Sequence, residues 1–490
     1  MAQRVDEAFA ALPLGKLAEA GLTRARRLGA ARAAVRVERV RTVESVTHNG
    51  KPRAGRDETE VGLSVRVACG GGWGFAAAGT LTAESAVRTA ERAVAVAGAC
   101  AGLSGPFVDQ VDEPVYRDVV WTSDCTINPV GVPEAERVAV LGDWSARLLG
   151  APAVEQVLAK VVATQENKFY ADLAGTVITQ QRVRIHPQLV VSGARANLRT
   201  VGPPAARGWE YLSGAGWDWE RELAELPGQL GEKTGAAPVE PGEYDLVLDP
   251  SHLWLTIHES VGHATELDRA LGHEISYAGT TFATPGRLGT LRFGSALMNV
   301  TADRTAPHAL ATVGFDDEGV AAQRWNLVED GVLTGFQLDR RTAGAIGAPR
   351  STGCAFAESA GHVPLPRMPN VSLRPLPGGP TTQELIAGVE RGIYLAGSGS
   401  FSIDARRKFF QFTAQRAHRI HRGRITGQVG RVAYQAGTTG FWGALDGLGG
   451  ERTYQTFGAD LCGKGQPVQI AAASHGCPSA LFRRIRVVNP

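Results

Sequence analysis

The segment Ile257-His258-Glu259-Ser260-Val261-Gly262-His263 places two histidines around a glutamate inside an apolar stretch that favours a helix. Histidines four residues apart share one face of an α-helix, but a spacing of five residues leaves them about 140° apart at 3.6 residues per turn. A single π turn widens the helix and returns both side chains to one face. Because glycine offers the least steric resistance to such a distortion, the spacing predicts π character around Gly262.

Two imidazoles in this arrangement favour zinc over harder cations, and a catalytic zinc site commonly has three protein ligands and an open position for water. The glutamate Glu259 follows the ligand His258 but points elsewhere, where it would take a proton from the zinc-activated water and return it to the leaving amine. The alternative is that His258 and His263 are independent, hydrogen-bonded histidines. The sequence leaves the third ligand open among Glu266, Asp268, His273, Cys354, Cys462 and Cys477.

Outside this segment the residue pattern predicts an α+β protein. In the first half, apolar spacing predicts a helix over residues 6–28 and another over residues 134–149, with alternating strand patterns after each of them. Asn49-Gly50 predicts a tight hairpin turn, and Thr82 is expected to cap a further helix. The second half is expected to be β-rich, because short apolar runs alternate there with turns rich in Gly, Pro and Asn.

A turn-rich stretch, PGQLGEKTGAAPVEP at residues 227–241, lacks apolar periodicity and marks the expected boundary between two domains. We therefore predict a mixed α/β N-terminal domain over residues 1–235. A β-rich C-terminal domain over residues 236–490 would carry the metal.

Composition excludes several classes of protein. The 490 residues include 51 Lys and Arg and 49 Asp and Glu, so the formal net charge of +2 favours neither nucleic acid nor an anionic membrane as a partner. The N-terminus lacks the apolar core of a signal peptide, and the apolar run at residues 93–103 is about half the length of a membrane span. We therefore expect a cytoplasmic protein, in which the six cysteines are available for metal or redox chemistry.

Five ordered stretches add to the histidine segment: HESVGHATELD at 258–268, GFDDEG at 314–319, LVEDGVL at 327–333, RMPN at 367–370 and LCGKGQ at 461–466. In these stretches, and over nearly its whole length, the sequence resembles the TldD/PmbA metalloproteases, a family also labelled modulators of DNA gyrase. The resemblance implies a two-domain protein with an α/β N-terminal domain and a β-rich, metal-carrying C-terminal domain.

The resemblance also implies site residues and partners. Cys462 would be the third zinc ligand beside His258 and His263, with Cys477 as its rival in the same tail and Glu259 as general base. Family members act on unfolded or small peptides, including antitoxins and precursors of peptide antibiotics. They commonly work as dimers, and many pair with a homologous TldE/PmbA subunit that lacks the HExxxH motif. Since this chain carries that motif, it would be the catalytic subunit of a heterodimer, or a homodimer.

The predicted function is zinc-dependent hydrolysis of peptides. The alternative is a non-catalytic regulatory or binding subunit, as the gyrase label suggests, and a zinc hydrolase of other amides is a third possibility. Three further features are expected to be structural. The acidic run 316–318 predicts a turn or an intersubunit contact, the basic run 416–424 a solvated hairpin or substrate-facing edge, and Trp442 a core residue.

Overall fold

The structure is a computed structural model that describes residues 4–103 and 107–489. In these ranges the first half forms one sheet of seven strands in the order β3-β2-β1-β5-β6-β4, with β7 on β6. Its strands are β1 (Arg32–His48), β2 (Lys51–Cys69), β3 (Gly72–Ala78), β4 (Val119–Thr122), β5 (Gln156–Asp172), β6 (Val177–Ser192) and β7 (Asn197–Arg199). Its helices are α1 (Glu7–Ala10), α2 (Leu14–Arg27), α3 (Ala83–Cys100), α4 (Glu134–Leu149) and α5 (Trp219–Gly235).

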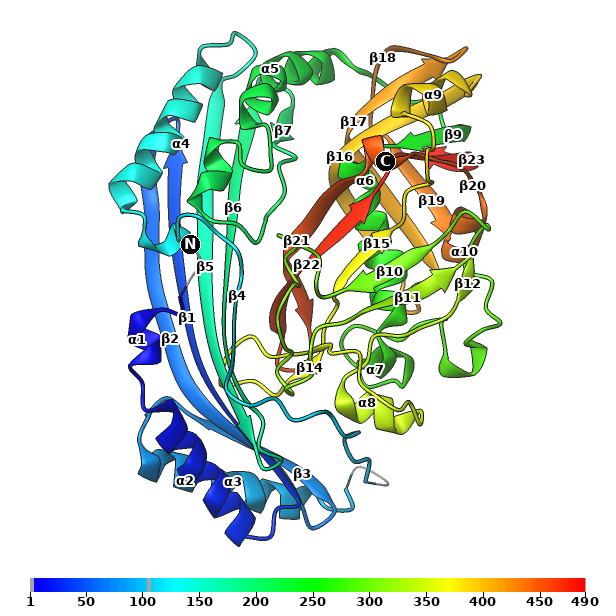
Figure 1. The fold of residues 1–490 in the computed structure, drawn as a ribbon. Coiled ribbons are helices and arrows are strands. Elements are labelled where there is room, and N and C mark those ends of the chain that lie inside the picture. The colour runs from blue at the N-terminus through cyan, green and yellow to red at the C-terminus, as the bar shows by residue number, and fades with distance from the viewer. Residues whose placement is uncertain (1–3, 104–106, 490) are drawn as a thin grey trace.

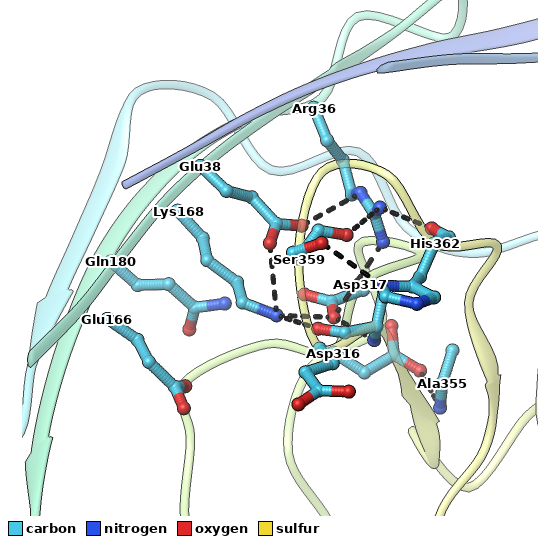
Figure 2. Close-up of polar contacts among 12 residues, drawn as sticks. Arg36, Glu38, Glu166, Lys168, Gln180, Asp316, Asp317, Ala355, Ser359 and His362 are labelled. Atoms are coloured by element: carbon cyan, nitrogen blue, oxygen red, sulfur yellow. Dashed lines mark hydrogen bonds and ion pairs between the residues drawn. The ribbon is translucent and has the colours of Figure 1, made fainter. Parts of the chain in front are cut away.

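The two faces of this long sheet have different neighbours. Val157 and Val161 on β5 belong to the apolar core beneath α4 and α5, whereas Phe169 belongs to the core beneath α2 and α3. The two pairs of helices therefore lie toward opposite ends of the sheet (Figure 1). Because side chains alternate along a strand, the residues between these apolar positions point the other way. Glu166 and Lys168 thus line the face that meets the second half of the chain (Figure 2).

Local sequence signals located several of these elements. Helix α4 has the predicted bounds, and the Thr82 side chain accepts a hydrogen bond from the backbone of Ser85 at the start of α3. Asn49 and Gly50, with φ of 50° and 74°, form the predicted turn between β1 and β2. The single helix predicted over residues 6–28 is wrong: Pro13 lies between α1 and α2.

The turn-rich interpretation of residues 227–241 is also wrong in its first part. Helix α5 continues through Pro227 to Gly235, with Leu223, Leu226 and Leu230 buried along one side. A proline inside a helix costs about 3 kcal/mol, so the packing of this apolar stripe outweighs the lost hydrogen bond. The division into domains at residues 235 and 236 stays a prediction.

The second half contains the expected β-rich structure. An eight-stranded sheet runs in the order β16-β9-β23-β19-β17-β18-β8, with β20 on β23, and an additional β16–β17 pairing closes five of its strands into a ring. Its strands are β8 (Ala237–Pro238), β9 (Gly242–Leu248), β16 (Arg391–Ile403), β17 (Phe409–His421), β18 (Arg424–Gly430), β19 (Ala433–Gly437), β20 (Leu445–Leu448) and β23 (Ala480–Val488). This combination confirms the predicted α+β class.

Smaller elements surround the ring. A four-stranded sheet has the order β12-β11-β10-β15, while β13 pairs with β14 and β21 with β22. These are β10 (Val300–Asp303), β11 (Arg324–Glu329), β12 (Val332–Leu333), β13 (Ala355–Phe356), β14 (Leu365–Pro366), β15 (Asn370–Leu373), β21 (Gln455–Lys464) and β22 (Gln469–Cys477). The helices are α6 (Pro250–Ile257), α7 (Leu267–Ala270), α8 (Arg340–Ala345), α9 (Thr382–Ala387) and α10 (Thr438–Gly443). None of the helices in the described ranges combines the length and the apolar character needed to cross a bilayer.

Two features of the second half, the basic run and Trp442, agree with what the sequence predicts. The basic run 416–424 spans the hairpin of β17 and β18, which is one of the two structures predicted for it. Trp442 is fully buried, as expected for a core residue, and its indole donates to the Ser260 hydroxyl at 2.9 Å.

Buried charges join the two halves. Lys168 of β5 donates to the Asp317 carboxylate at 2.7 Å and to the Ala357 carbonyl at 2.8 Å. Beside this pair, the Arg36 guanidinium lies 3.1 Å from the Glu38 carboxylate, both on β1 (Figure 2). A buried charge must be paired to be tolerated, so these contacts fix how the second half sits on the sheet.

The acidic run 316–318 supplies Asp317 and Glu318 as partners for cations of the first-half sheet. Asp316 accepts backbone hydrogen bonds from Glu318 and Val320, both at 2.9 Å, and from Ala355 at 3.0 Å. Burial, reinforced by Glu318, raises the pKa of Asp316 to about 8. Glu318 itself pairs with Arg66 of β2. The run is therefore a turn, and its contact joins the halves of one chain.

Replacing Lys168 with alanine should destabilise the protein, because Asp317 would keep a buried charge without its nearest cation and Glu38 would lose one of its two cationic neighbours. Removing one partner of a buried pair costs roughly 3 kcal/mol, which for a chain of this size corresponds to a melting temperature about 3 °C lower. Differential scanning calorimetry measures this shift. Lys160→Ala, on the same strand and face but without an ion pair among the described residues, is the matched control; equal shifts for both variants would contradict the role of Lys168.

Candidate metal centre

The two motif histidines follow α6 on a distorted turn. A π turn at His258–Gly262 succeeds the α-helix and is followed by a 3-10 turn at His263–Thr265, so the predicted π character is confirmed. The rings of His258 and His263 lie with their centroids 4.8 Å apart. Both imidazoles are buried and face a common point.

Gly262 is needed here for a reason other than the one its sequence suggests. Its backbone, at φ −54° and ψ −62°, is in the ordinary right-handed region open to any residue. A Cβ at this position would lie 2.4 Å from the sulfur of Met368. The glycine therefore makes room for Met368 against the π turn, and the steric demand comes from packing.

The hairpin of β21 and β22 brings in Cys462. Its register shifts between Ala459 and Cys462, and Arg367 donates to the carbonyl of Cys462 and, at 2.7 Å, to that of Gln469. The Cys462 sulfur lies 3.5 Å from Nε2 of His263. One ligand atom each from His258, His263 and Cys462 lie within 4.8 Å of one another, and all three residues are buried.

Hydrogen bonds fix which nitrogen of His258 is available as a ligand. Nδ1 of His475 lies 2.8 Å from the Val371 carbonyl, which only accepts, so Nδ1 carries the proton. Burial holds the pKa of His475 well below its usual value, so its Nε2 is a free acceptor. His258 Nδ1, 2.7 Å away, must therefore donate to it. This leaves the lone pair of the His258 Nε2 for a metal.

His263 is oriented in the same way by a carboxylate. Its Nδ1 lies 2.9 Å from Glu266, which Arg269 also contacts at 3.1 Å and Lys464 at 3.2 Å. Burial alone would raise the pKa of Glu266, but Lys464 and His263 hold it well below its usual value. An ionised Glu266 accepts a hydrogen bond from Nδ1 of His263. The Nε2 of His263 is therefore left free beside the thiol of Cys462.

Cys462 differs electrostatically from two other thiols of the second half. Burial by itself would raise its pKa, but the neighbouring His263 and Arg367 lower it, and a lower pKa favours the thiolate that binds metals. Burial instead raises the pKa of Cys354 to about 12 and that of Cys477 far above its usual value.

The other candidates for the third ligand lie elsewhere or have other partners. The sulfur of Cys477 is 3.7 Å from the Pro250 carbonyl. Glu266 is engaged by His263, Arg269 and Lys464, and Asp268 pairs with Lys464 at 2.8 Å. His273 is exposed and lies outside the buried group. Among the described residues, the group that could hold a metal consists of His258, His263 and Cys462.

Glu259 lies at the edge of this group. Its side chain, 8% exposed, accepts a hydrogen bond from Arg407 at 2.8 Å, a partner that the sequence did not indicate. Within residues 4–103 and 107–489, this carboxylate is hydrogen-bonded to Arg407 and to neither motif histidine. It is held by a residue from the turn between β16 and β17.

The donor set fits a zinc ion. Two neutral imidazole nitrogens and a thiol of lowered pKa converge, and the 3.5 Å between the His263 nitrogen and the Cys462 sulfur is close to the roughly 3.6 Å of a tetrahedral zinc site. With the neighbouring carboxylate Glu259, this arrangement is typical of a metal-dependent hydrolase.

Comparison with known proteins gives the same class. The sequence matches the profile of the PmbA/TldA metallopeptidase C-terminal domain over residues 241–489 and that of PmbA/TldA metallopeptidase domain 1 over residues 33–97. The chain belongs to the PmbA/TldD family of metallopeptidases.

Individual relatives extend over most of the chain. A metalloprotease of Methanothermobacter thermautotrophicus is 29% identical over 450 residues, covering 89% of this chain and 91% of the relative. A zinc metalloprotease TldD homologue of Saccharolobus solfataricus is 27% identical over 277 residues, or 55% of this chain and 57% of the relative. TldE from Thermococcus kodakarensis has the same fold, with a TM-score of 0.71 at 16% identity over 95% of this chain and 98% of that one.

Gly262→Ala should destabilise the π turn, because the added methyl overlaps Met368. Overpacking a core typically costs about 1–3 kcal/mol, and here the displaced backbone carries His263. We expect a lower melting temperature and less bound zinc, measured by calorimetry and elemental analysis.

Two variants control this test. Gly228→Ala, in α5 with open space around it, should not lower stability. Adding Met368→Ala to Gly262→Ala should restore part of the zinc content by removing the overlap. Full zinc content and stability in Gly262→Ala alone would contradict the packing role of the glycine.

His475→Ala should weaken metal binding without removing a ligand, because His258 loses the acceptor that fixes its tautomer. Loss of such a supporting residue typically lowers metal affinity about 10- to 100-fold. Competition with a fluorescent zinc chelator measures the affinity, and His475→Gln, which can still accept through its amide oxygen, should bind more tightly than His475→Ala. An affinity equal to wild type in His475→Ala would exclude this role.

Proposed function

We propose that this chain is a zinc-dependent peptidase in which His258, His263 and Cys462 hold the metal and Glu259 is the general base. The observation that carries the proposal is the convergence of two imidazoles and a thiol at a buried point beside that carboxylate. Membership of a metallopeptidase family supports it. When bound, zinc supplies a Lewis acid that polarises a carbonyl and lowers the pKa of water.

Glu259 would move the proton during hydrolysis. As a carboxylate it accepts a proton from the attacking water, and as a carboxylic acid it returns that proton to the amine nitrogen as the C–N bond breaks. Its position next to His258 on the π turn places it beside the ligands, and its burial keeps competing solvent away. Glu266 would not take part in proton transfer, because it is occupied by His263, Arg269 and Lys464.

Two cavities between the halves of the chain support a peptide substrate. They have volumes of about 690 and 280 Å³ and share a wall that includes Arg199. The smaller one is lined by Trp254, whose ring stacks on His475 at 6.0 Å, and by Leu461, which precedes a proposed ligand. Cavities of this size suit several residues of an extended chain, so we infer that unfolded or small peptides, such as peptide precursors or antitoxins, are the substrates.

Family membership also bears on partners and location. We infer that the chain works with a homologous TldE/PmbA-like subunit or with a second copy of itself, since a solved relative of the same fold is a TldE protein. Cys462 is a free thiol, and a thiolate ligand survives best in a reducing compartment, so we place the protein in the cytoplasm.

Glu259→Gln should abolish peptide cleavage while zinc content and melting temperature stay near those of wild type. The amide keeps the size of the side chain and can still accept from Arg407, but it cannot take up a proton. Cleavage of a mixture of unstructured peptides, followed by mass spectrometry, measures the loss, and Glu390→Gln, an exposed carboxylate in the same half, is the control.

The assay is run on the chain alone and mixed with a homologue that lacks HExxxH, so that an activity that needs both subunits is detected. Retained cleavage by Glu259→Gln would exclude the mechanism. A wild-type protein without stoichiometric zinc, alone and in the mixture, would favour a non-catalytic subunit instead.

A further inference from the structure

Arg407 is the charged residue that the turn between β16 and β17 presents to the metal centre. Its Nη1 donates to Glu259 at 2.8 Å, and its side chain is only 11% exposed. Its charge also interacts with Cys462 and Glu266, which places the guanidinium within electrostatic reach of the proposed ligands. A cation next to the general base and the metal group can affect both proton transfer and the charge that develops on a substrate.

The donors of this guanidinium are only partly used. Among the described residues its hydrogen bonds are limited to the one that Nη1 makes with Glu259. Nε is buried and has no partner, although an unsatisfied buried donor costs roughly 1–3 kcal/mol. Nε and Nη2 form the edge with which arginine binds a carboxylate or an oxyanion through two parallel bonds. That edge is left for a group from outside the chain.

The backbone that carries Arg407 is strained and firmly held. Arg407 has φ of 59°, a left-handed conformation that is uncommon for a residue other than glycine or asparagine. The Asp404 carboxylate accepts from the backbone of Lys408 at 2.6 Å, and the Thr438 hydroxyl donates to the Arg407 carbonyl at 2.5 Å. The turn also accepts a backbone hydrogen bond from Thr280, in the segment after the metal helix. Strain kept in place by its surroundings is a mark of a functional site.

We propose that Arg407 is a catalytic residue that binds the carbonyl oxygen of the scissile peptide through its Nε and Nη2 while Nη1 orients Glu259. This rests on the proposed peptidase function and adds to it the group that stabilises the transition state. As the water oxygen bonds to the carbonyl carbon, its proton passes to Glu259 and the carbonyl π electrons move to the oxygen. The Arg407 donors stabilise that oxyanion.

In the second half of the reaction, the oxyanion loses its negative charge and Glu259 becomes a carboxylate again. The oxyanion electrons re-form the C=O bond, the C–N bond breaks with its electron pair on nitrogen, and Glu259 gives its proton to that nitrogen. The products are an amine and a carboxylic acid, which ionises at neutral pH, so no additional reactant is required. Because the oxygen is more negative in the transition state than in the bound peptide, Arg407 should affect kcat far more than KM.

Arg407→Lys is the first test, since lysine keeps the positive charge but lacks the two-donor edge. We expect kcat to fall about 100- to 1000-fold, as for loss of an oxyanion donor, with KM changed less than about threefold and zinc content unchanged. Arg406→Lys, an exposed neighbour in the same turn, should retain wild-type kinetics.

Arg407→Gly is the second test, because glycine suits the left-handed backbone and the variant can keep the turn. Millimolar guanidinium chloride, far below denaturing concentrations, should restore part of its activity, and ammonium chloride at the same concentration should not. A structural role alone would not give this rescue.

The outcomes separate the two proposals. A wild-type enzyme that cleaves peptides together with an Arg407→Lys variant of equal kcat would overturn the role of Arg407 and leave the peptidase function standing. Loss of zinc, or a change confined to KM, would likewise overturn it. A zinc-loaded wild type that cleaves no peptide, alone or with a homologous subunit, would instead refute the proposed function.

Discussion

Two histidines five residues apart can face a common point only where the helix between them is widened, and this constraint shapes the surroundings of the site. The π turn at His258–Gly262 provides the widening, and Met368 packs against it where a glycine has no side chain. The preceding helix is tied to the closed ring of strands, because His252 and Thr256 both hydrogen-bond to the Tyr434 hydroxyl. A local distortion is therefore supported by the most buried part of the second half.

The polar residues around this turn are of two kinds: some use their hydrogen bonds to orient the motif histidines, and one has donors that are only partly used. His475 and Glu266 each accept a hydrogen bond from Nδ1 of one motif histidine. The Nε2 atoms of both motif histidines are therefore free and face the thiol of Cys462. The hydrogen-bonding capacity of His475 and Glu266 is largely consumed within the fold. Arg407 is different, because it holds Glu259 with one nitrogen and keeps a buried donor without a partner. His475 and Glu266 thus support the motif histidines, whereas Arg407 has a donor left for the proposed substrate.

The charged face of the first-half sheet fixes the position of one half of the chain relative to the other. Period-two alternation along β5 puts apolar side chains beneath the helices and charged ones toward the second half, where Lys168 meets Asp317. These paired charges lie between the two parts of the chain, and the cavities proposed for the peptide lie between them as well. Fixing the relative position of the halves thus also defines the shape of these cavities.

Features with a local cause were predictable from the sequence. The helix over 134–149, the Asn49-Gly50 turn and the π turn follow from periodicity, turn preference and spacing within a few residues. Prediction failed where tertiary packing overrode a local signal, as in α5, which continues through Pro227 because its leucines are buried. Prediction also failed to explain why residue 262 is a glycine, because the explanation depends on Met368, about a hundred positions away.

By itself, the sequence determined the α+β class, the histidine pair and its need for a widened helix, because each depends on neighbours along the chain. Family resemblance singled out Cys462, which spacing could not choose among the later thiols. Only the tertiary structure decided that His475, Arg367 and Arg407 belong to the same site. Their partners are separated from them by about a hundred residues or more, and such contacts arise from the closed ring of strands and the packing around it.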